Sequence, residues 1–169
     1  MYEVGEYIVH PGQGVCRIDE VVDSPQQTYM LMPVGVRHPI RISFPVASEG
    51  RLRPVVSQEE AQALINDYAD LDIIEYRGRG GALEEEFYRG EIKNGTCRDT
   101  VAVVKTFRER IAEVRSRNKK PPVAYERILK QARERSLAEL SVALDMPVED
   151  VDLVLSQNAR HCGNDARTV

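Results

Sequence analysis

The 169-residue sequence lacks the features of a membrane or secreted protein. It contains no run of about 20 apolar residues, the length that a membrane-spanning helix needs. Its first residues, MYEVGEYIVH, have neither the basic start nor the apolar stretch of a secretory signal. The three cysteines are an odd number without close spacing, which fits a reducing compartment better than a disulfide framework. The sequence therefore predicts a cytoplasmic protein.

Signatures of enzyme chemistry are also missing. GRGGA at 78–82 lacks the Lys-Ser/Thr ending of a phosphate loop, and HPGQG at 10–14 precedes a strand-like rather than a helical pattern. His10, His38 and His161 are too scattered to suggest a metal site. No serine or cysteine lies in a recognisable catalytic context. We therefore expect no enzymatic activity, metal, cofactor or small-molecule substrate.

The first 56 residues have the pattern of β structure. The segments EYIVH, GVCRIDEVV, TYMLMPV and PIRISFPV are short and rich in β-branched and aromatic residues, and turn formers such as PGQG and DSPQQ separate them. This predicts an antiparallel meander that closes toward a small β barrel. In PIRISFP, we expect Ile40, Ile42 and Phe44 to face the core, and Arg41 and Ser43 to face outward. Cys16 is expected to pack as a small apolar residue.

The period changes to that of helices after Val56. Ser57 and Glu60 form the sequence pattern of a capping box, and helical patterns continue to about residue 159. Gly95 and the NKKPP segment are expected to stop helices. The sequence thus predicts an α+β fold with a β-barrel domain at 1–56, an all-helical domain at 57–159 and a disordered tail at 160–169.

Charge is unevenly distributed along the chain. The net charge is -4, which argues against indiscriminate nucleic-acid binding, but residues 97–135 carry 12 Lys and Arg against 5 Asp and Glu. Such a segment can lie along phosphates, where counterion release supplies salt-sensitive affinity. The alternative is a solvated helical face with internal ion pairs, such as those of Arg110 and Arg117 with Glu109 and Glu113. The charge pattern leaves both readings open.

The order of these patterns resembles the CarD/CdnL family of bacterial transcription regulators. The resemblance rests on VGEYIVHPGQGVCRIDEV, TYMLMPV, IRISFPV, SQEEAQALI, NGTCRDTVAVVKTFRER and YERILKQARERSLAELSVAL, and covers about residues 2–157. It implies a Tudor- or SH3-like barrel that binds the β subunit of RNA polymerase, and a helical domain that contacts promoter DNA. The implied outcome is a change in open-complex lifetime without catalysis.

Candidate binding residues follow from this resemblance. The polymerase contacts are expected at Arg41, Ser43 and Ser24. Arg41 has an alternative reading as a solvated edge residue that guards against aggregation.

The DNA contacts depart from the family pattern because this chain has no tryptophan. Tyr76 is the nearest match to the family's wedge tryptophan, with Arg77 and Arg79 beside it as phosphate contacts. The alternative is that Tyr76 packs at a helix end. LEEEF stands where the family usually has basic residues, and its carboxylates would repel phosphates. The DNA face is therefore also sought in the basic segment, at Arg108, Arg115, Arg117, Lys119, Lys120, Arg127, Lys130 and Arg133. A protein-protein adaptor that binds the polymerase but not DNA is the alternative function.

Overall fold

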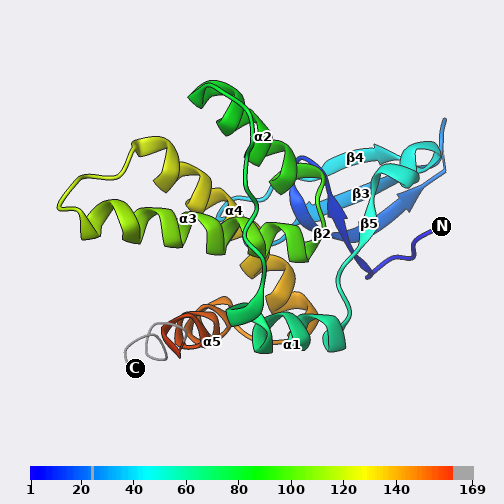
Figure 1. The fold of residues 1–169 in the computed structure, drawn as a ribbon. Helices are drawn as coiled ribbons and strands as arrows, with labels where there is room; N and C mark the ends of the chain where they lie inside the picture. The colour runs from blue at the N-terminus through cyan, green and yellow to red at the C-terminus, as the bar shows by residue number, and fades with distance from the viewer. Residues whose placement is uncertain (24, 162–169) are drawn as a thin grey trace.

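The computed structural model describes residues 1–23 and 25–161, and it has the predicted α+β architecture (Figure 1). Five antiparallel strands come first, and helices follow. The strands are β1 (Tyr7–His10), β2 (Gly14–Val22), β3 (Thr28–Pro33), β4 (Ile42–Pro45) and β5 (Arg53–Pro54). A 3-10 helix, η1 (Val46–Arg51), connects β4 to β5. The strand order in the sheet is β4-β3-β2-β1-β5.

The glycine-rich stretch after β1 is a hairpin turn. His10 pairs with Gly14 across the β1–β2 hairpin, and Gly14 has a φ of 77°, which a residue with a side chain rarely adopts. The His10 imidazole closes the turn, since its Nδ1 accepts hydrogen bonds from the backbone N–H groups of Gly12 (3.0 Å) and Gln13 (3.2 Å). The turn thus needs a small residue at position 14 and an unprotonated Nδ1 on His10.

The inner face of the sheet packs its own small core. Its members are Ile8, Cys16, Ile18, Tyr29, Leu31, Phe44 and Leu52. Burial raises the pKa of the Cys16 thiol to about 11, so Cys16 is a neutral packing residue, as predicted. The expectation for Ile40 was wrong: its side chain is 79% exposed, because β4 begins two residues later and Ile40 lies in the loop before it.

The strand pairing among the described residues does not close the predicted barrel, which would require the two edge strands of the sheet to pair with each other. Within residues 1–23 and 25–161, β4 and β5 are the edges of the sheet and do not pair with each other. β5 is only two residues long, and it pairs with β1 alone. The short strand leaves too few backbone groups to complete a ring.

The helices begin and end close to where the sequence predicts. They are α1 (Gln58–Asn66), η2 (Tyr68–Asp70), α2 (Gly81–Asn94), α3 (Cys97–Ser116), α4 (Val123–Leu144) and α5 (Val148–His161). Ser57 and Glu60 form the expected capping box. A second capping box, Thr96 with Asp99, starts α3 directly after Gly95 ends α2. Most of the predicted tail, 162–169, lies outside the described residues. No helix in the part of the chain that the structure describes is long and apolar enough to cross a membrane.

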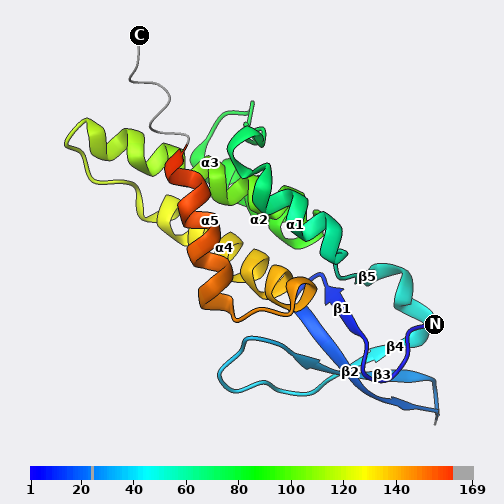
Figure 2. The ribbon, with the colours of Figure 1, turned by 90° about the horizontal axis from the view of Figure 1, so that it is seen from below.

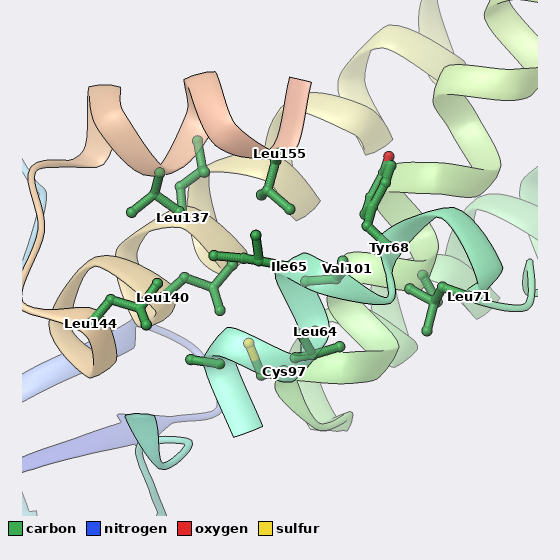
Figure 3. Close-up of a cluster of buried hydrophobic side chains, with 13 residues drawn as sticks. Leu64, Ile65, Tyr68, Leu71, Cys97, Val101, Leu137, Leu140, Leu144 and Leu155 are labelled. Carbon is green, nitrogen blue, oxygen red and sulfur yellow. The ribbon is translucent and has the colours of Figure 1, made fainter. Parts of the chain in front are cut away.

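Two apolar cores hold the helices together. The larger core joins α1, α3, α4 and α5, and Figure 3 shows Leu64 and Ile65 of α1 among Val101, Leu137, Leu140 and Leu155. The second core is built around Tyr88, Phe107 and Ile128, from α2, α3 and α4. Figures 1 and 2 place the sheet at one end of the molecule and the connection between α3 and α4 at the other.

The sheet and the helices are joined by two arginines. Arg53 of β5 makes a bidentate ion pair with Glu139 of α4, at 2.6 and 2.8 Å, and Glu139 is 1% exposed. The backbone N–H of Val56 donates to the same carboxylate at 3.1 Å. Arg135 of α4 donates to the backbone oxygens of His10 (3.1 Å) and Lys93 (3.2 Å). These bonds fix α4 against the edge of the sheet and against the end of α2.

The hairpin turn gives the fold a predictable pH dependence. Burial, followed by the nearby charges of Arg51, Arg135 and Lys93, lowers the pKa of His10 from its ordinary value of 6.5. The folded state therefore binds a proton less readily than the unfolded state does. The contribution of His10 to stability is fully present above pH 6.5 and is lost as the pH falls through the folded-state pKa.

We expect a His10→Asn variant to lose less stability than the wild type as the pH is lowered from 7 to about 5. Asparagine keeps an oxygen that can accept from the turn, but it does not titrate. Urea unfolding at several pH values measures the difference. The control is His38→Asn at an exposed position, and equal pH profiles for His10→Asn and wild type would contradict the expectation.

Candidate functional site

The first candidate surface is the outer edge of β4. Ser43 is exposed on this strand, while Phe44 beside it is buried. The Val46 N–H donates to the Gln27 oxygen at 3.0 Å, and Phe44 pairs with Tyr29. Since successive residues of an antiparallel strand alternate in direction, the backbone of Ser43 faces away from β3. The edge therefore offers the unsatisfied N–H and C=O groups of Ser43 to a partner strand.

Arg41 and Ser24 are the other two residues predicted to contact the polymerase. Arg41 is about half exposed, and its guanidinium lies 3.7 Å from Asp19 and 3.4 Å from Glu20, both on β2. Its charge is thus shared with two carboxylates of its own domain. Ser24 lies outside the described residues, so its predicted contact is not placed.

The second candidate surface begins with a segment that crosses α3 without helical or strand structure. Figure 1 shows this segment, residues 71–80, running from η2 across α3 to the start of α2. Side chains of α3 hold it: Lys105 Nζ donates to the backbone oxygens of Ala69 and Leu71, and Thr106 Oγ1 accepts from the Ile74 N–H at 3.0 Å. We call residues 71–80 the strap.

The hydroxyl of Tyr88 fixes the middle of the strap. It donates to the Ile74 oxygen at 2.6 Å and accepts from the Tyr76 N–H (3.2 Å) and from the Arg110 guanidinium (3.0 Å). Tyr88 itself is fully buried. Two hydrogen bonds of the hydroxyl thus set the backbone on both sides of Glu75, and the third holds Arg110, which uses all the hydrogen-bonding positions of a phenolic hydroxyl.

Tyr76 lies at the end of this anchored part. Its ring is half-buried and lies 5.4 Å from the ring of Phe87, centre to centre. The ring also folds back over Gly78, where any side chain would overlap the Tyr76 hydroxyl. These contacts agree with Tyr76 as a packing residue. Its position next to the exposed Arg77 and Arg79 agrees equally with Tyr76 as the residue that takes the place of the family's wedge tryptophan. Both roles stay predictions.

Four of the predicted DNA-binding cations are without an ion-pair partner in the described part of the chain. Arg77 and Arg79 on the strap, and Lys119 and Lys120 between α3 and α4, are exposed and make no ion pair with another described residue. Lys119 and Lys120 belong to the connection between α3 and α4, at the end of the molecule remote from the sheet (Figures 1 and 2), and Arg77 and Arg79 lie on the strap, shortly before the start of α2. We call Arg77, Arg79, Lys119 and Lys120 the distal cations.

The remaining predicted cations are paired with carboxylates. Arg108 and Arg133 both contact Asp152 of α5. Within α3, Arg117 pairs with Glu113 at 2.6 Å, as the ion-pair reading of the sequence expects. The other pairs are Arg115 with Glu126 (3.4 Å), Arg127 with Glu85 (2.8 Å) and Lys130 with Glu134 (3.9 Å). Exposed pairs of this kind contribute little to stability, but they reduce the positive potential of α3 and α4.

Two of the three glutamates at the start of α2 are paired in the same way. Glu84 binds Arg110 at 2.6 Å, and Glu85 binds both Arg89 and Arg127. The repulsion that LEEEF would exert on phosphates is therefore weaker than its sequence suggests.

Arg110 has a structural role that the sequence did not predict: it pairs with Glu84 of α2 in place of the expected Glu109 or Glu113. Its guanidinium carbon lies within 6 Å of three ring centres, at 5.4 Å from Tyr88, 5.2 Å from Phe107 and 5.8 Å from Tyr125. The three rings come from α2, α3 and α4. Nothing in the spacing of the sequence reveals this cluster, because it depends on how the three helices pack.

Comparison with known proteins identifies the class of the first domain. Residues 2–56 match the family model of the CarD-like/TRCF RID domain. This match covers the whole sheet, and it implies that this part of the chain interacts with RNA polymerase. The resemblance to CarD-like proteins is thereby confirmed for residues 2–56 of this chain. No curated protein matches the chain.

Proposed function

We propose that the protein is a non-enzymatic, cytoplasmic transcription regulator that binds the β subunit of RNA polymerase and promoter DNA, and so changes open-complex lifetime. The observation that carries the proposal is the CarD-like/TRCF RID match over residues 2–56. The distal cations, on the helical part of the same chain, support the DNA contact.

The polymerase contact is proposed at the edge of β4. An exposed edge strand can extend the sheet of a partner through main-chain hydrogen bonds. Ser43 supplies the outward-facing backbone groups, and Arg41 lies next to it. The ion pairs of Arg41 with Asp19 and Glu20 direct its side chain across the sheet toward β2, so its contact with the polymerase is proposed on the face of the sheet and not along the open edge.

Ser43→Pro is expected to weaken polymerase binding by at least about tenfold, since proline removes the outward N–H and blocks strand addition. The fold should survive, because a proline is tolerated where its N–H would face solvent. Binding to purified polymerase by biolayer interferometry, with circular dichroism for the fold, measures both effects. The matched control is Ser43→Ala, which keeps the N–H and should bind like wild type. Equal binding by the folded Ser43→Pro variant would exclude this edge.

The DNA contact is proposed at the distal cations and Tyr76. Extending the lifetime of an open complex tenfold requires only about 1.4 kcal/mol of preferential binding. A few phosphate contacts supply an attraction of this order without strong affinity for free DNA. The strap holds Arg77 and Arg79 near Tyr76, so that a base step and its phosphates can be contacted together.

The alternative is an adaptor that binds the polymerase without contacting DNA. The ion pairs of Arg108, Arg115, Arg127 and Arg133 favour it, because they reduce the positive potential of the basic segment. Fluorescence anisotropy with forked promoter DNA, at low and raised salt and with or without polymerase, separates the two functions. We expect salt-sensitive binding that the polymerase strengthens, and no salt-sensitive binding under either condition would favour the adaptor.

A further inference from the structure

A small cavity lies where the sheet and the helices meet. Its volume is about 220 Å³, and its walls come from the end of β1, from η1 and β5, from the C-terminal end of α2 and from α4. Arg51, Arg53, Lys93 and Arg135 line it, and no Asp or Glu among the described residues does. The Arg53 side chain is occupied by Glu139 just outside the cavity.

The positive charge of this cavity is only partly compensated. Arg51 and Lys93 are exposed and pair with no carboxylate in the described part of the chain. The Arg135 guanidinium donates to two backbone oxygens, those of His10 and Lys93, but its Nε is buried and has no hydrogen-bond partner among residues 1–23 and 25–161. Buried donors are normally satisfied. The chain therefore holds an arginine at the wall of the cavity with part of its hydrogen-bonding capacity unused.

Two neighbouring groups register the positive potential. The pKa of His10 is lowered by burial and then by Arg51, Arg135 and Lys93. The pKa of Arg135 is lowered by burial and then by Arg53, although Glu139 acts in the opposite direction. Burial is the larger cause of the lowered pKa in both groups, and the neighbouring cations add to it, as an excess of positive charge does. An anion in the cavity would raise the pKa of His10 and of Arg135, opposite to the effect of the neighbouring cations.

The cavity opens toward a larger hollow. A groove of about 870 Å³ lies between the β1–β2 turn, the start of the β3–β4 connection, α2 and α4, and it shares Pro11, Lys93 and Arg135 with the small cavity. Its volume is in the range of small-molecule sites, whereas the cavity alone is below that range. Since Arg89, Arg133 and Glu134 also line the groove, the two hollows together suit a ligand with a compact anionic group and a larger polar part.

We propose that this junction cavity binds the phosphate group of a phosphorylated small molecule, whose remaining part lies in the adjoining groove. Arg51 and Lys93 contact the phosphate from the sheet side and the helix side, and Arg135 backs the site. The ligand thereby adds a bridge between η1, α2 and α4. A phosphate of nucleic acid is the less suitable source, since the cavity is recessed between two parts of the chain and is remote from the distal cations. The proposal does not depend on the function proposed above.

Sodium pyrophosphate tests the proposal with the full-length protein at constant ionic strength. The pKa of His10, followed by NMR, should rise with pyrophosphate, and the melting temperature should increase. The resonances of His38, in the β3–β4 connection, should not respond. Arg51→Gln and Lys93→Gln should each weaken the binding by about tenfold, the loss expected for one charge-assisted hydrogen bond.

Lys120→Gln is the control, because it removes one positive charge at the other end of the molecule. All three substituted side chains are exposed, so the variants should fold, and their melting temperatures without ligand verify this. Absence of any His10 response, or equal weakening by Lys120→Gln, would overturn the proposal. So would a His10 response to a single-stranded oligonucleotide that pyrophosphate does not produce, since the site would then bind the nucleic-acid backbone.

Discussion

Replacing Arg53 by methionine should lower the free energy of unfolding by about 3–5 kcal/mol, the usual cost of leaving one partner of a buried ion pair alone. Glu139 is 1% exposed, and apart from Arg53 its carboxylate accepts from the Val56 N–H. Without Arg53, the carboxylate must stay charged in a poorly solvated place or take up a proton. Urea unfolding at pH 7, followed by circular dichroism, measures the loss.

The double variant Arg53→Met/Glu139→Leu distinguishes the cost of an unpaired charge from the value of the pair. Replacing both members of a buried pair by apolar residues is often close to neutral. We therefore expect the double variant to recover much of the stability that Arg53→Met loses. Arg51→Met, an exposed neighbour without a carboxylate partner, should change stability by less than about 0.5 kcal/mol. A small effect of Arg53→Met alone would contradict the structural role of the pair.

Neutralising the four distal cations should have the largest effect on DNA binding. The variant replaces Arg77, Arg79, Lys119 and Lys120 with glutamine. Each phosphate contact removed should reduce the slope of log K against log salt by about 0.7 for single strands to 0.9 for duplex. If all four residues contact phosphates, the slope should fall by about 3 units. Anisotropy titrations of forked promoter DNA across a salt series measure this change.

The matched control neutralises four cations that the structure shows in ion pairs: Arg115, Arg117, Arg127 and Lys130. It changes the net charge by the same amount, so any effect of overall charge is equal in the two variants. We expect the control to retain most of its salt slope. A larger loss in the control than in the distal variant would move the DNA surface to α3 and α4. Unchanged polymerase binding by both variants would confirm that the two surfaces are independent.

Local sequence signals predicted the elements of this fold well. Ser57 with Glu60, and Gly95 after α2, mark helix boundaries because capping and chain reversal depend on a few neighbouring residues. The alternation in β4 placed Phe44 inside and Ser43 outside, but it failed at Ile40, where the strand has not yet begun. Strand ends depend on pairing partners, which the alternation of apolar residues does not encode.

The candidate site was predictable only in part. The sequence pointed to Arg77, Arg79 and the basic segment as sources of positive charge. It could not distinguish Lys119 and Lys120, unpaired among the described residues, from the paired Arg127 and Arg133, because the carboxylates that pair with Arg127 and Arg133 lie on other helices. The anchoring of the strap by Tyr88 and Thr106 was equally hidden, since those contacts join residues 12 to 32 positions apart.

By itself, the sequence determined the α+β order, the helix boundaries and the β1–β2 turn, because each depends on hydrogen bonds and dihedral preferences among near neighbours. Only the tertiary structure decided which cations remain without carboxylate partners, how Arg53 and Arg135 join the two parts, and that a positively charged cavity lies between them. Electrostatic interactions act through space, so the net effect of a charge depends on which distant residues folding brings beside it.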